Sequence, residues 1–249
     1  MSKFIAGGCS FTYGHELSDD QEGKRPSKKT WAHGLKPQEH EYVCTAYPGT
    51  GNSGIARRVF NAVANNTDVG GVVVMWSFLS RYDWAMPRHQ VLENTRWTSI
   101  SPWDTDTGNE EAFRSLAGSE SQQEQWRTRR DTFAETGVKP FAEAIYKHAA
   151  NQYHETYLSW KSIIWLQNIL EKKQIPFMFT LADNSLFYDE QTQHKDQDAF
   201  MTALHNEIDL SKWFFFGSLG IITSNYFDEQ EKAIKYNTLI SNIVMLQNV

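Results

Sequence analysis

Short unbroken apolar runs alternate with helical patterns over most of this chain. Four runs read as strands, at residues 4–6, 41–46, 71–76 and 175–181. A strand that is apolar at consecutive positions suits a parallel sheet covered on both faces. The order of strands and helices therefore predicts an α/β domain in three layers, α/β/α, with a mainly parallel sheet.

Helical spacing of apolar residues marks three segments between and after these strands. The first runs from Ser53 to Ala64, with Asn52 or Ser53 available to cap its first turn. A longer helix is expected over residues 157–170 and another over 233–244. Sheets of this kind bind ligands at the carboxyl ends of their strands, so the residues that follow each strand are the first candidates for a site.

A tryptophan-rich segment at about residues 83–154 interrupts the alternation. The length of 249 residues suits a single domain, residues 1–249, and we interpret this segment as an insertion or lid at the edge of the sheet. Its tryptophans either line a binding loop or form a satellite core, and the satellite core is preferred; they are Trp84, Trp97, Trp103 and Trp126.

Composition argues against several classes of function. The chain has 24 basic and 30 acidic residues, for a formal net charge of −6, and no basic stripe, so no nucleic-acid partner is expected. No apolar run approaches the roughly 18–20 residues that cross a bilayer, so no membrane partner is expected either. Two cysteines and no signal-peptide pattern predict a cytoplasmic protein.

The stretch A-G-G-C-S-F-T-Y-G at residues 6–14 stands where the first strand ends. Small residues there allow a sharp turn that leaves the hydroxyl of Ser10 exposed at the ligand edge, as a nucleophile requires. Alternatively, Ser10 only caps the next helix. Cys9 and Cys44 are interpreted as small buried residues rather than nucleophiles.

This stretch resembles the first motif, G-D-S-x-T-x-G, of the SGNH (GDSL-like) hydrolases, with Cys9 in place of the aspartate. The resemblance is to proteins common in bacteriophage and bacterial genomes, and it implies an SGNH-hydrolase or flavodoxin-like fold with Ser10 as the nucleophile. The second family motif brings a glycine N–H to the oxyanion hole. Gly51 is the better match for it here, and Gly49 the next.

The third motif of the family, G-x-N-D, is replaced after the third strand by a segment that contains Ser77 and Arg81. Asn52 is a candidate substitute for the missing asparagine as an oxyanion donor. A guanidinium at Arg81 would bind an anionic group or stabilise negative charge, or would only form a surface salt bridge. Asp183, after the fourth strand, is expected to offer polar contacts to a ligand.

The fourth motif, D-x-x-H, supplies the family's catalytic base, and this chain has no histidine after His205. Phe227 stands about where that histidine belongs. The base is therefore unknown, and the candidates are His15, His89, His154 and His205, with His194 as a further one.

The resemblance implies a serine ester hydrolase that removes O-acyl groups, such as acetyl, from a carbohydrate or a related small ester, without cofactor or metal. The alternative is a catalytically inactive protein of the same fold that binds carbohydrate or serves in a virion, because a serine without a base is a poor nucleophile. An oligomer or virion partner is left open, and a phage protein would lie in the host cytoplasm or the virion.

Overall fold

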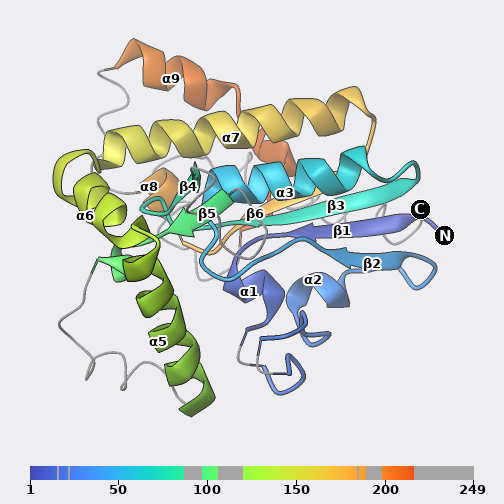
Figure 1. The fold of residues 1–249 in the computed structure, drawn as a ribbon. Helices are drawn as coiled ribbons and strands as arrows, with labels where there is room; N and C mark the ends of the chain where they lie inside the picture. The colour runs from blue at the N-terminus through green and yellow to red at the C-terminus, as the bar shows by residue number, and fades with distance from the viewer. Residues whose placement is uncertain are drawn as a thin grey trace.

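A parallel sheet of four strands lies at the centre of the molecule (Figure 1). The computed structural model describes residues 1–15, 17–21, 23–86, 97–105, 120–183, 185–188 and 198–215. The sheet order is β2-β1-β3-β6, and every pairing is parallel. The four predicted strands are confirmed, with bounds β1 (Lys3–Gly7), β2 (Glu41–Cys44), β3 (Val69–Trp76) and β6 (Phe177–Leu181).

Helices cover both faces of this sheet, which completes the three layers. Helices α3 (Asn52–Ala64) and α7 (Gln152–Lys172) lie on one face, and the short α1 (Ser10–Tyr13) and α2 (Trp31–Gly34) lie on the other (Figure 1). Successive side chains of a strand point to opposite faces. In β1, Ile5 accordingly joins the apolar cluster under α3 and α7, whereas Phe4 and Ala6 join the cluster on the α2 side.

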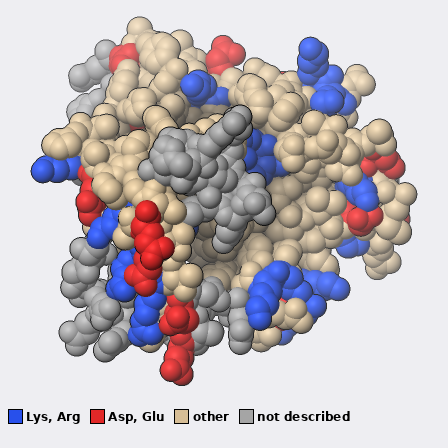
Figure 2. Space-filling view, viewed as in Figure 1, with Lys and Arg blue, Asp and Glu red and all other residues tan. Residues whose placement is uncertain are grey.

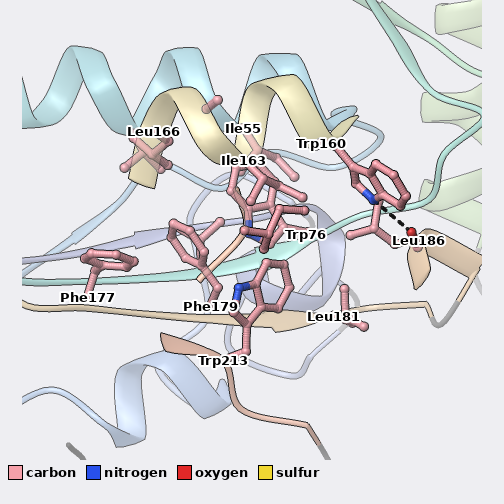
Figure 3. Close-up of a cluster of buried hydrophobic side chains, with 14 of the residues drawn as sticks. Ile55, Trp76, Trp160, Ile163, Leu166, Phe177, Phe179, Leu181, Leu186 and Trp213 are labelled. Atoms are coloured by element: carbon pink, nitrogen blue, oxygen red, sulfur yellow. Dashed lines mark hydrogen bonds between the residues drawn. The ribbon is translucent and has the colours of Figure 1, made fainter. Parts of the chain in front are cut away.

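The larger cluster is rich in aromatic side chains (Figure 3). The rings of Trp76 and Phe179, from neighbouring strands, meet edge to face with centroids 5.3 Å apart. Trp160 of α7 is buried, and its indole N–H donates to the carbonyl of Leu186 at 3.1 Å. That bond satisfies a polar atom that would be costly to bury alone, and it ties α7 to α8 (Ser185–Tyr188).

Between β3 and α7 the chain forms a smaller second unit of structure. Strands β4 (Tyr82–Ala85) and β5 (Trp97–Ile100) pair antiparallel, and η2 (Pro102–Asp104), α5 (Glu120–Glu135) and α6 (Val138–His148) follow. Its own apolar cluster is built on buried Tyr82, Met86, Ile100, Phe133, Val138 and Ala142.

The preferred interpretation of the tryptophans in this unit is wrong. Trp84, Trp97 and Trp103 are 48, 41 and 49% exposed and are not among the buried residues of the cluster, although the ring of Trp84 meets Phe141 at the margin of the cluster. The side chain of Trp126 lies outside the described residues.

The last described segment lies beside β6, the strand at one edge of the sheet. After α9 (Ala199–Asn206) and η4 (Leu210–Lys212), Trp213 forms a parallel bridge with Phe179 of β6. The expected helix at 233–244 and Phe227 lie outside the described residues. None of the described helices combines the length and apolar character that a membrane span requires.

Candidate functional site

The site expected from the sequence lies where the chain reverses the order of its strands. From β1 the chain passes to β2 on one side and then returns to β3 on the other side. A crevice for ligands forms outside the carboxyl ends of two such strands, because their connections leave in opposite directions. The place where the strand order reverses, between β1 and β3, is called the switch point below. Ser10 follows β1, and Ser77 and Arg81 follow β3, so these three predicted residues all lie in the segments that leave the switch point.

The turn that carries Ser10 is closed by tight packing. A side chain at Gly8 would come within 2.3 Å of the hydroxyl of buried Thr12, so only glycine fits there. Gly14 ends the helix with a left-handed φ of 75°, and its N–H donates to the carbonyl of Ser10 at 2.8 Å. Ser10 is half-buried and is the first residue of α1. The backbone N–H of such a residue has no acceptor within its own helix.

The segment after β2 is bound to this turn. The N–H of Tyr47 donates to the carbonyl of Gly8 at 3.1 Å. Thr50 N–H then donates to the Tyr47 carbonyl at 3.2 Å, with Pro48 and Gly49 at the central positions of the turn. The φ of Gly49 is 79°, as the third residue of a type II turn requires. Gly49 therefore shapes the loop that approaches Ser10.

Gly51 has a different role from Gly49. It caps α3, and a side chain there would come within 2.4 Å of the Arg81 carbonyl oxygen and 2.8 Å of a carboxylate oxygen of Asp83. Glycine is needed because the start of α3 packs directly on the backbone that follows β3. This contact brings the second glycine segment to the same sheet edge as Arg81. The role of Gly51 as an oxyanion donor remains a prediction.

Asn52 is a buried bridge, which argues against the substitute role expected for its side chain. Its Nδ2 donates to the Ser77 carbonyl at 3.2 Å and to Ser159 Oγ at 2.9 Å, while its Oδ1 accepts from the Ser77 N–H at 2.7 Å. Both amide protons are therefore used to join the end of β3 to α7. They are not available to an oxyanion in this geometry.

Arg81 lies in a fixed position beside Ser77. Its Nη1 donates to Ser77 Oγ at 2.8 Å, and its guanidinium stands over the ring of Phe78, 4.6 Å from the centroid. Phe78 in turn is 6.5 Å, between ring centroids, from Phe11, the residue next to Ser10. The aromatic contact thus links the end of β1 to the guanidinium at the end of β3.

Two carboxylates lie near this edge, and each already holds local structure. Asp183 Oδ1 accepts from the N–H of Ser185, the first residue of the short α8, at 2.9 Å. Asp83 accepts from the N–H of Gly54 at 2.8 Å and from Ser99 Oγ, and so ties β4 and β5 to the start of α3. Burial raises the pKa of Asp83, against the opposing effect of these hydrogen bonds. Asp83 was not predictable from the sequence, since the groups that donate to it, at Gly54 and Ser99, lie far away along the chain.

The structure separates the candidate histidines. His15 directly follows α1, and its Nδ1 lies 3.5 Å from Oδ2 of Asp20. The backbone N–H of His15 also donates to the Ser10 carbonyl, at 3.2 Å. His15 is one of the bases predicted from the sequence and Asp20 is not, although Asp20 lies five residues after His15 just as His15 lies five residues after Ser10.

The remaining histidines have other surroundings. His154 is exposed in the first turn of α7, with its ring 6.3 Å from that of Tyr157. His205 packs edge-on against Trp160, 5.1 Å between centroids, at the large apolar cluster. His89 and His194 lie outside the described residues.

The cysteines and the acidic residues do not form a second reactive centre in the described part of the chain. Cys9 is buried, and burial raises the pKa of the Cys44 thiol, which disfavours a thiolate there. Within the described ranges, no group of three or more His, Cys, Asp or Glu side chains is arranged to hold a metal ion.

Comparison with solved structures finds chains that match this fold. No protein-family model matches the chain, and no curated protein matches its sequence. Among solved structures, a variant of the esterase AlinE4 with one aspartate replaced by alanine aligns over 97% of this chain and 96% of its own. The identity is 9% and the TM-score 0.35.

Proposed function

We propose that this protein is a serine esterase of the SGNH type that removes an acyl group from a carbohydrate or a related small ester, with Ser10 as nucleophile and His15 as base. The observation that supports the proposal is the position of Ser10 at the switch point of a parallel sheet, followed five residues later by His15, whose Nδ1 lies 3.5 Å from Oδ2 of Asp20. Nucleophile, base and orienting acid are the three parts that a hydroxyl needs to attack an ester.

In this mechanism His15 Nε2 takes the proton of Ser10 as Oγ attacks the ester carbonyl carbon. Asp20, on the Nδ1 side, orients the ring and stabilises the imidazolium. The bond from carbon to the alcohol oxygen then breaks, and the alcohol leaves with the proton from His15. Water hydrolyses the acyl-serine by the same steps in reverse. The proposed oxyanion donors are the backbone N–H groups of Ser10 and Gly51.

Hydrolysis of p-nitrophenyl acetate by the wild type and by Ser10→Ala tests the proposal. We expect the variant to lose nearly all activity, whereas Ser53→Ala, which changes an exposed serine in the first turn of α3, retains it. Thermal melting followed by circular dichroism checks that both variants fold. Equal rates for wild type and Ser10→Ala would sink the proposal.

A second candidate is a non-catalytic protein of the same fold that binds carbohydrate or serves in a virion. The partial exposure of Trp84 and Trp103 favours it, because aromatic side chains with an apolar body and a polar tip are enriched at binding interfaces. In that case the wild type would not hydrolyse acetylated oligosaccharides, and Ser10→Ala would bind them as tightly as the wild type does. Isothermal titration with both proteins distinguishes the two candidates.

A further inference from the structure

Two arginines stand over aromatic rings on either side of Ser10. After β2, the guanidinium of Arg58 lies 4.9 Å from the centroid of the Tyr47 ring. After β3, that of Arg81 lies 4.6 Å from the centroid of Phe78. Because β1 is the strand between β2 and β3, the turn that carries Ser10 lies between these two pairs.

Arg81 is the better placed of the two to bind a ligand. The Nε of Arg58 already donates to the Thr45 carbonyl at 2.8 Å. Arg81 is half-buried and held from two directions, by Ser77 Oγ and by the Phe78 ring. A guanidinium has five N–H donors in a rigid fork, so one bond to Ser77 leaves most of them for a ligand.

The charge of Arg81 is not balanced by a carboxylate within the described part of the chain, where no acidic side chain lies at ion-pair distance from it. Arg129 provides the comparison: it lies 4.1 Å over Phe133 in the same manner, yet its Nε and Nη2 bond Asp104 at 2.8 and 3.1 Å. The nearby carboxylates of Asp83 and Asp183 are occupied by the donors described above.

Exposed basic side chains lie in the loop beside α1. Figure 2 shows the surface hollowed near α1, with lysine and arginine side chains where the loop at residues 24–29 lies. The loop is held to α1 by a hydrogen bond from the Tyr13 hydroxyl to the Gly23 carbonyl, 2.7 Å. Its exposed basic residues are Lys24, Arg25, Lys28 and Lys29. The same segment, between α1 and α2, also carries acidic residues, Asp19 and Asp20 among them, so these exposed cations offer contacts to an anion but no net local charge.

We propose that the substrate of this site is an ester that carries an anionic group, a carboxylate in the simplest case, which Arg81 binds while Phe11 contacts an apolar or flat face of the same molecule. Phe11 is 55% exposed and stands next to Ser10, which suits such a contact. The inference rests on the proposed function, since it names the substrate class of that same site. An acylated sugar acid and a small acidic aryl ester share this chemistry.

The test uses two aryl acetates that differ in one charge, 4-acetoxybenzoate and its neutral methyl ester. The ratio of their kcat/KM values is measured for the wild type, Arg81→Gln and Arg81→Lys. We expect Arg81→Gln to lower the ratio of anionic to neutral turnover about tenfold to a hundredfold, as for loss of a charge-assisted hydrogen bond. Arg81→Lys keeps the charge without the fork and should give an intermediate ratio.

Arg127→Gln is the matched control, because it removes one positive charge from an exposed position on α5. Its ratio should stay within about twofold of the wild type, since exposed charges are screened by salt. A ratio that is the same in wild type and Arg81→Gln overturns the inference, even when Ser10→Ala shows the esterase to be real.

Binding separates this inference from the proposed function. Titration calorimetry of the wild type with 4-hydroxybenzoate and with its methyl ester needs no turnover. If neither acetate is hydrolysed but the anion binds more tightly than the neutral ester, and Arg81→Gln removes that preference, the esterase proposal fails and the anion site is supported. If Arg81→Gln changes neither the binding preference nor the turnover ratio, the anion site is refuted.

Discussion

His15 faces Asp20 across the turn that follows α1, with Nδ1 of the histidine 3.5 Å from Oδ2 of the aspartate and both side chains largely buried. In a catalytic histidine, a carboxylate on one ring nitrogen fixes the tautomer that leaves the other nitrogen basic. Among the candidate histidines that the structure describes, His15 has a carboxylate close to Nδ1, although no hydrogen bond joins the two, and the rings of His154 and His205 lie against aromatic rings.

Replacing His15 by glutamine is expected to lower kcat for p-nitrophenyl acetate about a hundredfold or more, since general-base catalysis contributes about 10²–10⁴. Asp20→Asn should lower it less, because the base itself remains. The control is His154→Gln, which changes an exposed histidine on α7 and should leave kcat near that of the wild type. Full activity in His15→Gln would exclude this residue as the base.

Asn52→Ala is expected to lower the free energy of unfolding by about 2–4 kcal/mol, because it removes three buried hydrogen bonds that the Ser77 backbone and the Ser159 hydroxyl make with Asn52. Urea denaturation measures the change. Asn65→Ala, at the exposed end of the same helix, should cost less than about 1 kcal/mol. A loss in Asn52→Ala no larger than that of the control would contradict the bridging role.

Gly51→Ala should destabilise the protein by about 2 kcal/mol or more, since the new methyl group would approach the Arg81 carbonyl oxygen to 2.4 Å and the backbone there must shift. The control is Gly34→Ala in α2, where a methyl group meets nothing within 4 Å. Removing a helical glycine there should be neutral or stabilising by up to about 1 kcal/mol. Similar melting temperatures for the two variants would argue against the close packing of α3 on the segment after β3.

The stability of the protein should depend on pH through Asp83. Burial raises the pKa of this carboxyl in the folded state, so the folded protein holds the proton more tightly than the unfolded chain does. This contribution to stability is fully present below the unfolded pKa and is lost as pH rises through the folded pKa. Wild type should therefore lose stability relative to Asp83→Asn as the pH is raised from acid to neutral, as urea unfolding at several pH values would measure.

Asp19→Asn provides a control of opposite sign. A hydrogen bond from Ser27 lowers the pKa of Asp19, so its contribution is present at neutral pH and is lost as pH falls through the folded pKa. Wild type should exceed Asp19→Asn in stability at neutral pH, and the gap should close in acid. If both variants showed the same dependence on pH, the assignment of the titration to Asp83 would fail.

The sheet was predictable from sequence because burial on both faces leaves a local mark. Residues Val72, Val73 and Val74 are all buried, and they alternate between the two apolar clusters. The position of Ser10 was predictable for a related reason, since it directly follows a strand. The exposure of the tryptophans was not predictable. A tryptophan-rich stretch of sequence does not show which apolar residues of the folded chain fill the cluster next to it.

By itself, the sequence determined the parallel sheet, the helices beside it and the position of Ser10 at the carboxyl end of β1, because periodicity and glycine turns act over a few residues. Only the tertiary structure decided which polar groups meet. The hydrogen bonds of Asn52 join it to residues 25 and 107 positions away, and the guanidinium of Arg81 comes to lie beside the Ser10 turn through Phe78 and Phe11. Such partners are chosen by the packing of whole elements, which short stretches of sequence do not record.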